Sequence, residues 1–252
     1  MKLQFEQLKG FNLQAEDGLI GNIKDVLFDD HRWGGRWLVA DTGEWLPGRK
    51  VLLSPISLED PDPDKKRIPV RMSKQEISDS PPLEEDAPVS LQYEKTFYDQ
   101  FYWPYYWIGG GLWANQTVPA YLDPKWNQEE IDTTVEPDPE HREHVLRSAD
   151  ELKHYQANSS RTLEPEGLGT VTDLVIDTGT WSIPYLILQN RRLMPSKKIL
   201  VPQDRVVSTG WREHAIHLDL DENVFSLAPG MEETDCISRE DEDRARAFFD
   251  RP

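Results

Sequence analysis

The sequence predicts a mainly β protein in which two copies of one small antiparallel β-barrel, each with short helices, are joined by an aromatic-rich connector. Three observations carry this prediction. The chain repeats itself at a fixed offset, each copy consists of short runs of strand-forming residues, and aromatic residues are concentrated between the copies. A length of 252 residues also suits two domains better than one.

The internal repeat aligns the segment that begins at Gly21 with the segment that begins at Gly169, an offset of 169 − 21 = 148. Polar, apolar and turn positions stay in phase over most of each copy. We therefore predict a first barrel at residues 1–85, a connector at 86–147, a second barrel at 148–232 and an acidic C-terminal tail at 233–252. Eight residues define the repeat: Gly21, Asp25, Asp29 and Trp33 in the first copy, and Gly169, Asp173, Asp177 and Trp181 in the second.

The strands of the first copy are predicted from the runs "NIKDVLFDD", "RWLVADT" and "KVLLSPISL", which are rich in branched and aromatic residues. Gly, Asp and Pro separate these runs, a pattern typical of short strands between turns. Closing such strands into a barrel leaves few open edges. The Ser-x-x-Glu pattern from Ser73 to Glu76 is a capping box, so a short helix is expected to follow Ser73.

The segment "IGNIKDVLFDD" followed by "RWLVADTGEWLPGRKVLLSPISL" resembles the PRC-barrel domain, and the second copy resembles a more diverged version of it. This family includes the cytoplasmic domain of the H subunit of photosynthetic reaction centres and the C-terminal domain of a ribosome-maturation factor that binds a ribosomal protein. The resemblance implies a non-enzymatic scaffold or adaptor. It leaves an alternative open, an accessory protein of a membrane-associated electron-transfer complex or of a complex similar to the reaction centre.

Composition restricts the class of partner. The formal net charge of −18 opposes binding to nucleic acid, because that binding depends on Lys and Arg side chains that neutralise phosphates. The single cysteine, Cys236, allows no internal disulfide and fits a reducing cytoplasm. The first residues lack the apolar core of a signal peptide, and no apolar run is long enough to span a bilayer. We expect a cytoplasmic protein that binds a protein partner or itself, with contact to a membrane surface disfavoured.

Two Asp-Thr-Gly triplets, at Asp41 and Asp177, invite comparison with the paired carboxylates of aspartic proteases. The repeat argues against such a pair, since Asp41 is equivalent to Gln189 and Asp177 to Asp29. The three histidines at residues 141–154 are interpreted as charged surface, because a zinc site needs about four well-placed ligands. We predict no catalytic residue, no cofactor and no metal site, and we interpret the repeated Gly and Asp positions as structural.

The connector contains a cluster of aromatic residues. Between Tyr93 and Trp113 lie ten of the chain's 25 aromatic residues, so at least part of this segment should be ordered. Packing within the chain is the favoured interpretation, since each buried ring contributes about 1.5–3 kcal/mol. Exposed rings would instead mark a contact with a protein partner, a second copy or a membrane interface. The candidate contact residues are Tyr102, Trp103, Tyr105, Tyr106, Trp107 and Trp113.

Overall fold

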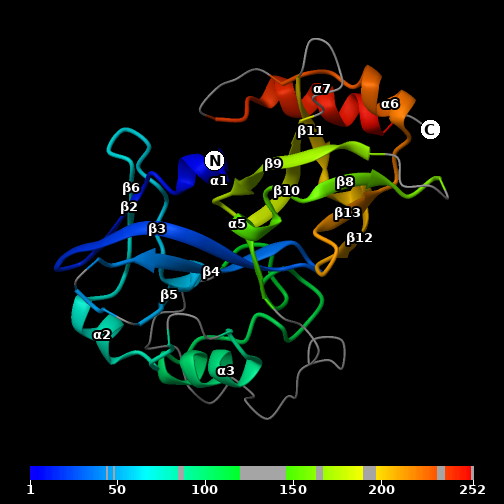
Figure 1. Cartoon of the computed structure of the whole chain (residues 1–252). Helices are drawn as coiled ribbons and strands as arrows, with labels where there is room; N and C mark the ends of the chain where they lie inside the picture. Colours follow the sequence, from blue (N-terminus) through cyan, green and yellow to red (C-terminus); the bar gives the residue numbers. More distant parts are fainter. Residues whose placement is uncertain are drawn as a thin grey trace. The chain divides into compact units, whose positions relative to one another are not determined.

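The computed structural model describes residues 1–43, 45–47, 49–84, 88–119, 146–162, 167–189, 197–231 and 236–250. The chain is mainly β, as the sequence predicts, and the described strands pair in both antiparallel and parallel directions (Figure 1). Residue contacts divide the chain into two compact units. Unit 1 consists of residues 1–8, 148–177 and 183–252, and unit 2 consists of residues 9–147 and 178–182.

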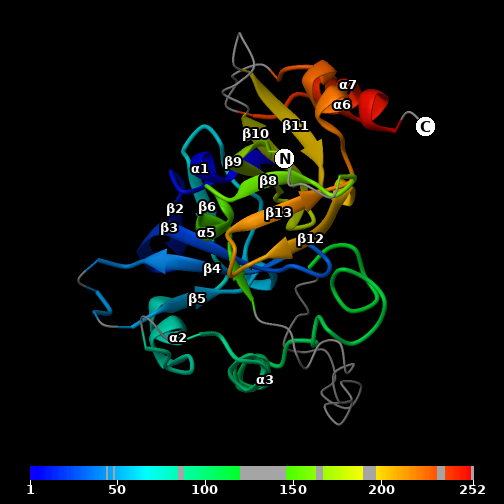
Figure 2. The same cartoon turned by 45° about the vertical axis from the view of Figure 1, so that its right-hand side comes forward.

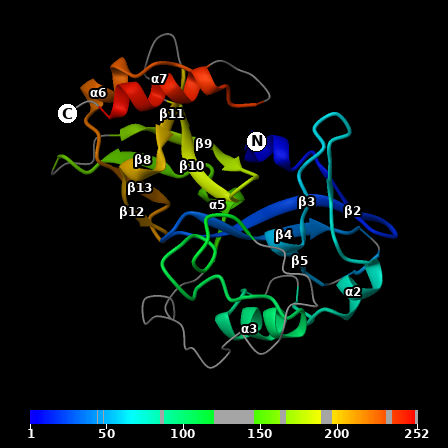
Figure 3. The same cartoon turned by 180° about the vertical axis from the view of Figure 1, so that it is seen from behind.

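Unit 1 contains most of the second repeat together with the first eight residues. Its strands lie in the order β12-β13-β8-β9-β10-β11, and β1 pairs antiparallel with the C-terminal end of β9. Helix α7 contacts β11, as seen from behind in Figure 3. The elements are β1 (Lys2–Gln4), α1 (Phe5–Leu8), α5 (Ala149–Leu152), β8 (Gln156–Ser159), β9 (Gly167–Asp177), β10 (Ser182–Gln189), β11 (Lys198–Pro202), η3 (Gln203–Arg205), β12 (Val206–Gly210), β13 (Ala215–Leu218), α6 (Glu222–Leu227) and α7 (Arg239–Phe249).

Unit 2 contains most of the first repeat and the described part of the connector. Its strands lie in the order β6-β2-β3-β4-β5, and β3 and β4 form a long antiparallel hairpin. Buried side chains such as Phe28, Trp37 and Leu38 form its core. The elements are β2 (Asn12–Ala15), β3 (Gly18–Asp29), β4 (Gly34–Asp41), β5 (Val51–Leu53), η1 (Pro55–Ser57), β6 (Arg67–Pro69), α2 (Lys74–Asp79) and α3 (Leu91–Gln100), with β7 (Arg147–Ser148) pairing with β3.

The secondary structure recurs at the offset of 148 found in the sequence. Strands β4 and β10 span equivalent residues, and so do helices α2 and α6. Helices α3 and α7 also begin at equivalent residues, Leu91 and Arg239. The structural repeat therefore continues beyond residues 85 and 232. Helix α3, in the predicted connector, is the counterpart of α7, in the predicted tail.

Two features differ from the predicted pair of antiparallel barrels. Strands β2 and β6 pair in parallel, and so do β8 and β13. Alternating apolar residues determine which face of a strand is buried, but they do not determine the direction of its neighbour. In addition, residues 1–8 belong with the second repeat, because β1 pairs with β9.

The capping box predicted at Ser73 is confirmed. The Ser73 hydroxyl accepts a hydrogen bond from the Glu76 backbone N–H at 3.2 Å, and the Glu76 carboxylate accepts one from the Ser73 backbone N–H at 2.7 Å. Helix α2 follows directly, because its first turn has partners for two otherwise unsatisfied donors.

Candidate functional site

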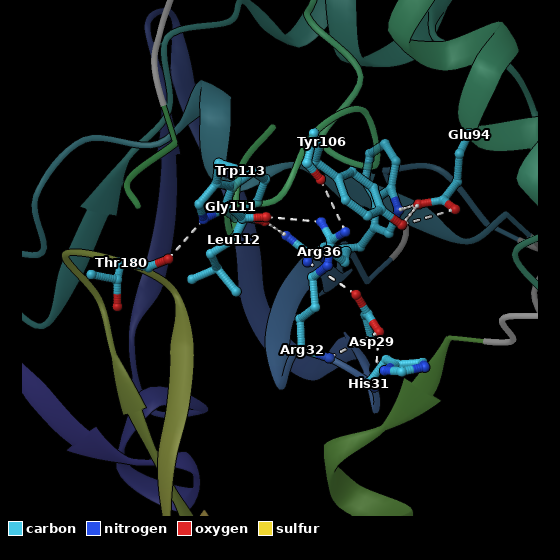
Figure 4. A network of polar contacts seen from close by, with 12 residues as sticks. Asp29, His31, Arg32, Arg36, Glu94, Tyr106, Gly111, Leu112, Trp113 and Thr180 are labelled. Atoms are coloured by element: carbon cyan, nitrogen blue, oxygen red, sulfur yellow. Dashed lines mark hydrogen bonds and ion pairs between the residues drawn. The ribbon is translucent and has the colours of Figure 1, made fainter. Parts of the chain in front are cut away.

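The densest group of buried polar side chains lies in unit 2 and centres on Arg36 (Figure 4). Arg36 belongs to β4 and is completely buried. Its guanidinium forms an ion pair with Asp29 Oδ2 at 3.0 Å and donates to the Leu112 carbonyl at 2.6 Å. The guanidinium carbon also lies 4.0 Å from the ring centroid of Tyr106 and 4.9 Å from that of Trp113. Burial of a charged group is costly, so this set of contacts offsets the loss of hydration.

Asp29 has two roles in this network. Its Oδ2 pairs with Arg36, while its Oδ1 accepts backbone N–H bonds from His31 at 2.9 Å and from Arg32 at 3.4 Å. The same carboxylate thus closes the turn between β3 and β4 and neutralises the buried cation. The Arg32 side chain donates to the carbonyl of Gly111 at 2.8 Å, so the turn and the connector are joined at a second point.

Glu94, on α3, is the third buried charged residue of the network, after Arg36 and Asp29. Its Oε1 accepts from Trp37 Nε1 at 2.8 Å and from the Tyr106 hydroxyl at 3.0 Å. Burial raises the pKa of Glu94 to about 7, an effect that the two hydrogen bonds and the nearby Arg36 partly oppose. Burial likewise raises the pKa of Tyr106 well above its usual value.

A carboxyl group with a pKa near 7 has the acidity that general acid–base chemistry uses. Here, however, Glu94 accepts from Trp37 and Tyr106, and the two terminal nitrogens of Arg36 donate to Asp29 and Leu112, all within unit 2. The network joins β4 to α3 and to the segment after it, so its observed contacts are structural.

The aromatic candidate residues lie largely in the interior of unit 2. Trp103, Tyr105, Tyr106, Trp107 and Trp113 are each at most 6% exposed, whereas Tyr102 is 57% exposed. The buried rings pack on α3 and on one another; for example, the ring centroids of Tyr98 and Trp107 are 5.5 Å apart. Of the six candidate contact residues, Tyr102 alone has a side chain that is largely exposed in folded unit 2.

The residues that define the repeat keep equivalent backbone geometry. Trp33 and Trp181 both have positive φ, at 53° and 57°, in the turn that follows the first long strand of each repeat. Gly21 and Gly169 both have φ of 155°. A Cβ atom on Gly21 would lie 1.8 Å from the Asp41 carbonyl oxygen, so close backbone approach requires glycine there.

The repeated aspartates contact backbone groups. Asp25 Oδ1 accepts from the Val26 N–H at 2.7 Å, and Asp173 Oδ1 accepts from the Leu174 N–H at 2.8 Å. Burial raises the pKa of Asp173 to about 6, an effect opposed by hydrogen bonds from the Leu174 and Glu6 backbone N–H groups and by nearby Lys153. Asp177 ends β9, where it lies opposite Lys2 in the β1–β9 pairing.

Unit 1 contains a counterpart of the contact between α3 and β4. Glu242 of α7 is equivalent to Glu94, and Tyr185 of β10 is equivalent to Trp37. The Tyr185 hydroxyl donates to Glu242 at 3.5 Å, and Glu242 also forms an ion pair with Lys2. The position equivalent to Arg36 is Pro184, so the buried guanidinium is specific to the repeat that carries the aromatic connector.

Sequence reasoning did not identify Arg36 and Glu94 as buried. A signal was present, since Arg36 interrupts the apolar run "WGGRWLVA", and Glu94 lies three and four residues before Phe97 and Tyr98 on α3. Of the histidines at residues 141–154, His141 and His144 lie outside the described residues. Across the part of the chain that the structure describes, no group of three or more His, Cys, Asp or Glu side chains is placed to hold a metal ion.

A comparison of the chain with protein-family models found no match, and a search of curated proteins found no matching sequence. The resemblance to the PRC-barrel domain stays a prediction. Among the described helices, none combines the length and the apolar composition that crossing a membrane requires.

Proposed function

We propose that the chain is a non-enzymatic scaffold or adaptor that is built from two PRC-type β-barrels and binds a protein partner through unit 1. The resemblance of the first repeat to the PRC-barrel domain supports the adaptor class. The contacts of Arg36, Asp29 and Glu94 support a structural role for these three buried charged groups, since each joins elements of unit 2.

One observation carries the choice of unit 1. The second repeat exposes two apolar side chains, Val207 at 60% and Leu227 at 76%, at positions where the first repeat has Glu59 and Asp79. Acidic side chains at these positions are compatible with the fold, because one copy of the same fold carries them. The replacement of exposed acidic side chains by apolar ones at these two positions of the second repeat supports a binding role for the surface that carries them.

A partner of a different kind is favoured over a second copy of the chain. Each chain carries a formal charge of −18, so two copies repel each other, whereas a basic partner is attracted.

Affinity capture with immobilised variants tests the proposal. The double variant V207E/L227D gives the second repeat the residues of the first, and L19E is the matched control because Leu19, in β3 of unit 2, is also exposed, at 53%. We expect a stoichiometric partner from a lysate of the source cells to be retained by the wild type and by L19E, and to fall at least tenfold with V207E/L227D. Circular dichroism of each variant establishes that it is folded.

Equal capture by all three proteins would mean that unit 1 does not bind through these residues. If light scattering gives the mass of two chains for the wild type and of one chain for V207E/L227D, the partner bound by unit 1 is a second copy of the chain.

A further inference from the structure

Among the strands that the structure describes, β12 of unit 1 has a partner on one side only. It pairs with β13 and ends the strand order of the sheet, as Figure 2 shows. Its five residues, "VVSTG", carry no charge and include three β-branched side chains. Val207 and Ser208 are exposed. Among the described residues, the backbone groups of β12 form hydrogen bonds with β13 alone.

The first repeat protects the equivalent edge. Residues 58–62, "LEDPD", are equivalent to β12 and keep its register, because Leu58 lies opposite Val70 and Asp62 opposite Arg67. The corresponding pairs in unit 1 are Val206 with Leu218 and Gly210 with Ala215. Charged residues and proline are the means by which natural proteins prevent pairing at a sheet edge. The chain therefore applies this protection in one repeat and omits it in the other.

Thr209 is the position at which the difference matters most. The pair Asp62–Arg67 exchanges both of its backbone hydrogen bonds, at 2.8 and 3.1 Å. By equivalence Gly210 is the hydrogen-bonded position in β12, and in an antiparallel ladder the next residue directs its N–H and C=O to the opposite side. We thus expect the Thr209 N–H to point outward, and its counterpart Pro61 has no N–H to offer.

We propose that β12 accepts an extended, cationic segment of another protein as an added antiparallel or parallel strand. This inference rests on the proposed function and specifies its binding mode. Main-chain hydrogen bonds to an open edge give such complexes their affinity. The formal charge of −18 selects a segment rich in Lys or Arg over a second copy of the chain. Two exposed acidic residues flank the strand, Asp204 before it and Glu213 after it, with Arg205 and Arg212 beside them; Asp204 also forms an ion pair with Arg246 at 2.7 Å.

The probe is a blocked synthetic peptide of alternating lysine and valine, compared with its glutamate–valine counterpart. Thr209→Pro removes the outward N–H, as Pro61 does in the first repeat, and Thr209→Val is the matched control that keeps the N–H and the branched side chain. We expect the lysine–valine peptide to bind wild type and T209V with equal affinity and T209P at least tenfold more weakly. In the wild type, hydrogen exchange of the Thr209 amide should slow at least tenfold when peptide is bound.

The exchange measurement keeps the inference falsifiable if T209P fails to fold. Unchanged exchange at Thr209, or equal binding of the glutamate–valine peptide, would overturn it. A wild-type dimer that T209P converts to monomer would assign the edge to a second copy instead. If the partner captured by the wild type is captured equally by folded T209P, the edge inference fails while the proposed function stands; loss of that partner with T209P supports both.

Discussion

Replacing Glu94 by Gln tests the energetic consequence of the buried carboxyl group in unit 2. Burial raises the pKa of Glu94 from 4.5 to about 7, a difference of roughly 2.5 units. Since one pKa unit corresponds to about 1.4 kcal/mol, ionising Glu94 inside the folded protein costs about 3 kcal/mol relative to ionising it in the unfolded chain.

The direction of the pH dependence follows from this difference. Between about pH 4.5 and pH 7 the folded state retains a proton on Glu94 that the unfolded state has released. The stabilisation is therefore complete below pH 4.5, and it is lost as the pH rises through about 7. In E94Q the side chain cannot ionise, so this part of the pH dependence disappears.

Urea unfolding of wild type and E94Q, followed by circular dichroism from pH 4.5 to 8, measures the effect. With rising pH the difference in the free energy of unfolding should change by about 3 kcal/mol in favour of E94Q. The contribution of Asp173, whose pKa burial raises to about 6, is common to both proteins and cancels in the difference. E59Q serves as a control at an exposed carboxylate. A difference that stays constant over this range would refute the reasoning, because Glu94 would then ionise equally in both states.

Two further substitutions test contacts described above. Arg36→Ala leaves the Asp29 carboxylate buried without its cation, so the free energy of unfolding should fall by about 3–5 kcal/mol. The double variant R36M/D29N removes both charges and should lower the free energy of unfolding less than R36A does; the reverse order in chemical unfolding would contradict this account. Gly21→Ala places a Cβ atom against the Asp41 carbonyl oxygen and should lower the free energy of unfolding by about 1–3 kcal/mol. Gly110→Ala is the control, because a Cβ atom there meets open space and should change the melting temperature little. Equal melting temperatures for the two variants would show that the backbone at Gly21 adjusts without cost.

The elements that sequence reasoning identified correctly are those specified by local patterns. The helix after Ser73 follows from hydrogen bonds within four residues. The long strands follow from the branched and aromatic runs that begin near Gly21 and Gly169, and the fixed offset of the repeat transfers each assignment from one copy to the other. Local hydrogen bonds and side-chain periodicity suffice for such elements.

Features that depend on distant partners were not predictable in the same way. Glu94 accepts from Trp37, 57 residues away, and a glutamate is expected on the surface unless that partner is known. Helices α3 and α7 are equivalent, but "LQYEKTFYDQ" is aromatic and "REDEDRARAFF" is charged, so composition conceals the equivalence. The parallel pairing of β2 with β6 is a property of topology, which side-chain alternation does not encode.

The pairing of β1 with β9 has a consequence for how the protein is made. Residues 1–8 are synthesised before β9, the strand that β1 pairs with, which follows about 170 residues later. At about 5–20 residues per second, Leu3, Phe5 and Leu8 remain without their final burial for on the order of ten seconds or more. A fragment that begins at residue 148 lacks β1 and α1 altogether, and a synthetic peptide of residues 1–8 supplied separately should restore part of its stability. The second repeat is therefore not a self-contained domain, because its sheet includes a strand from the first eight residues of the chain.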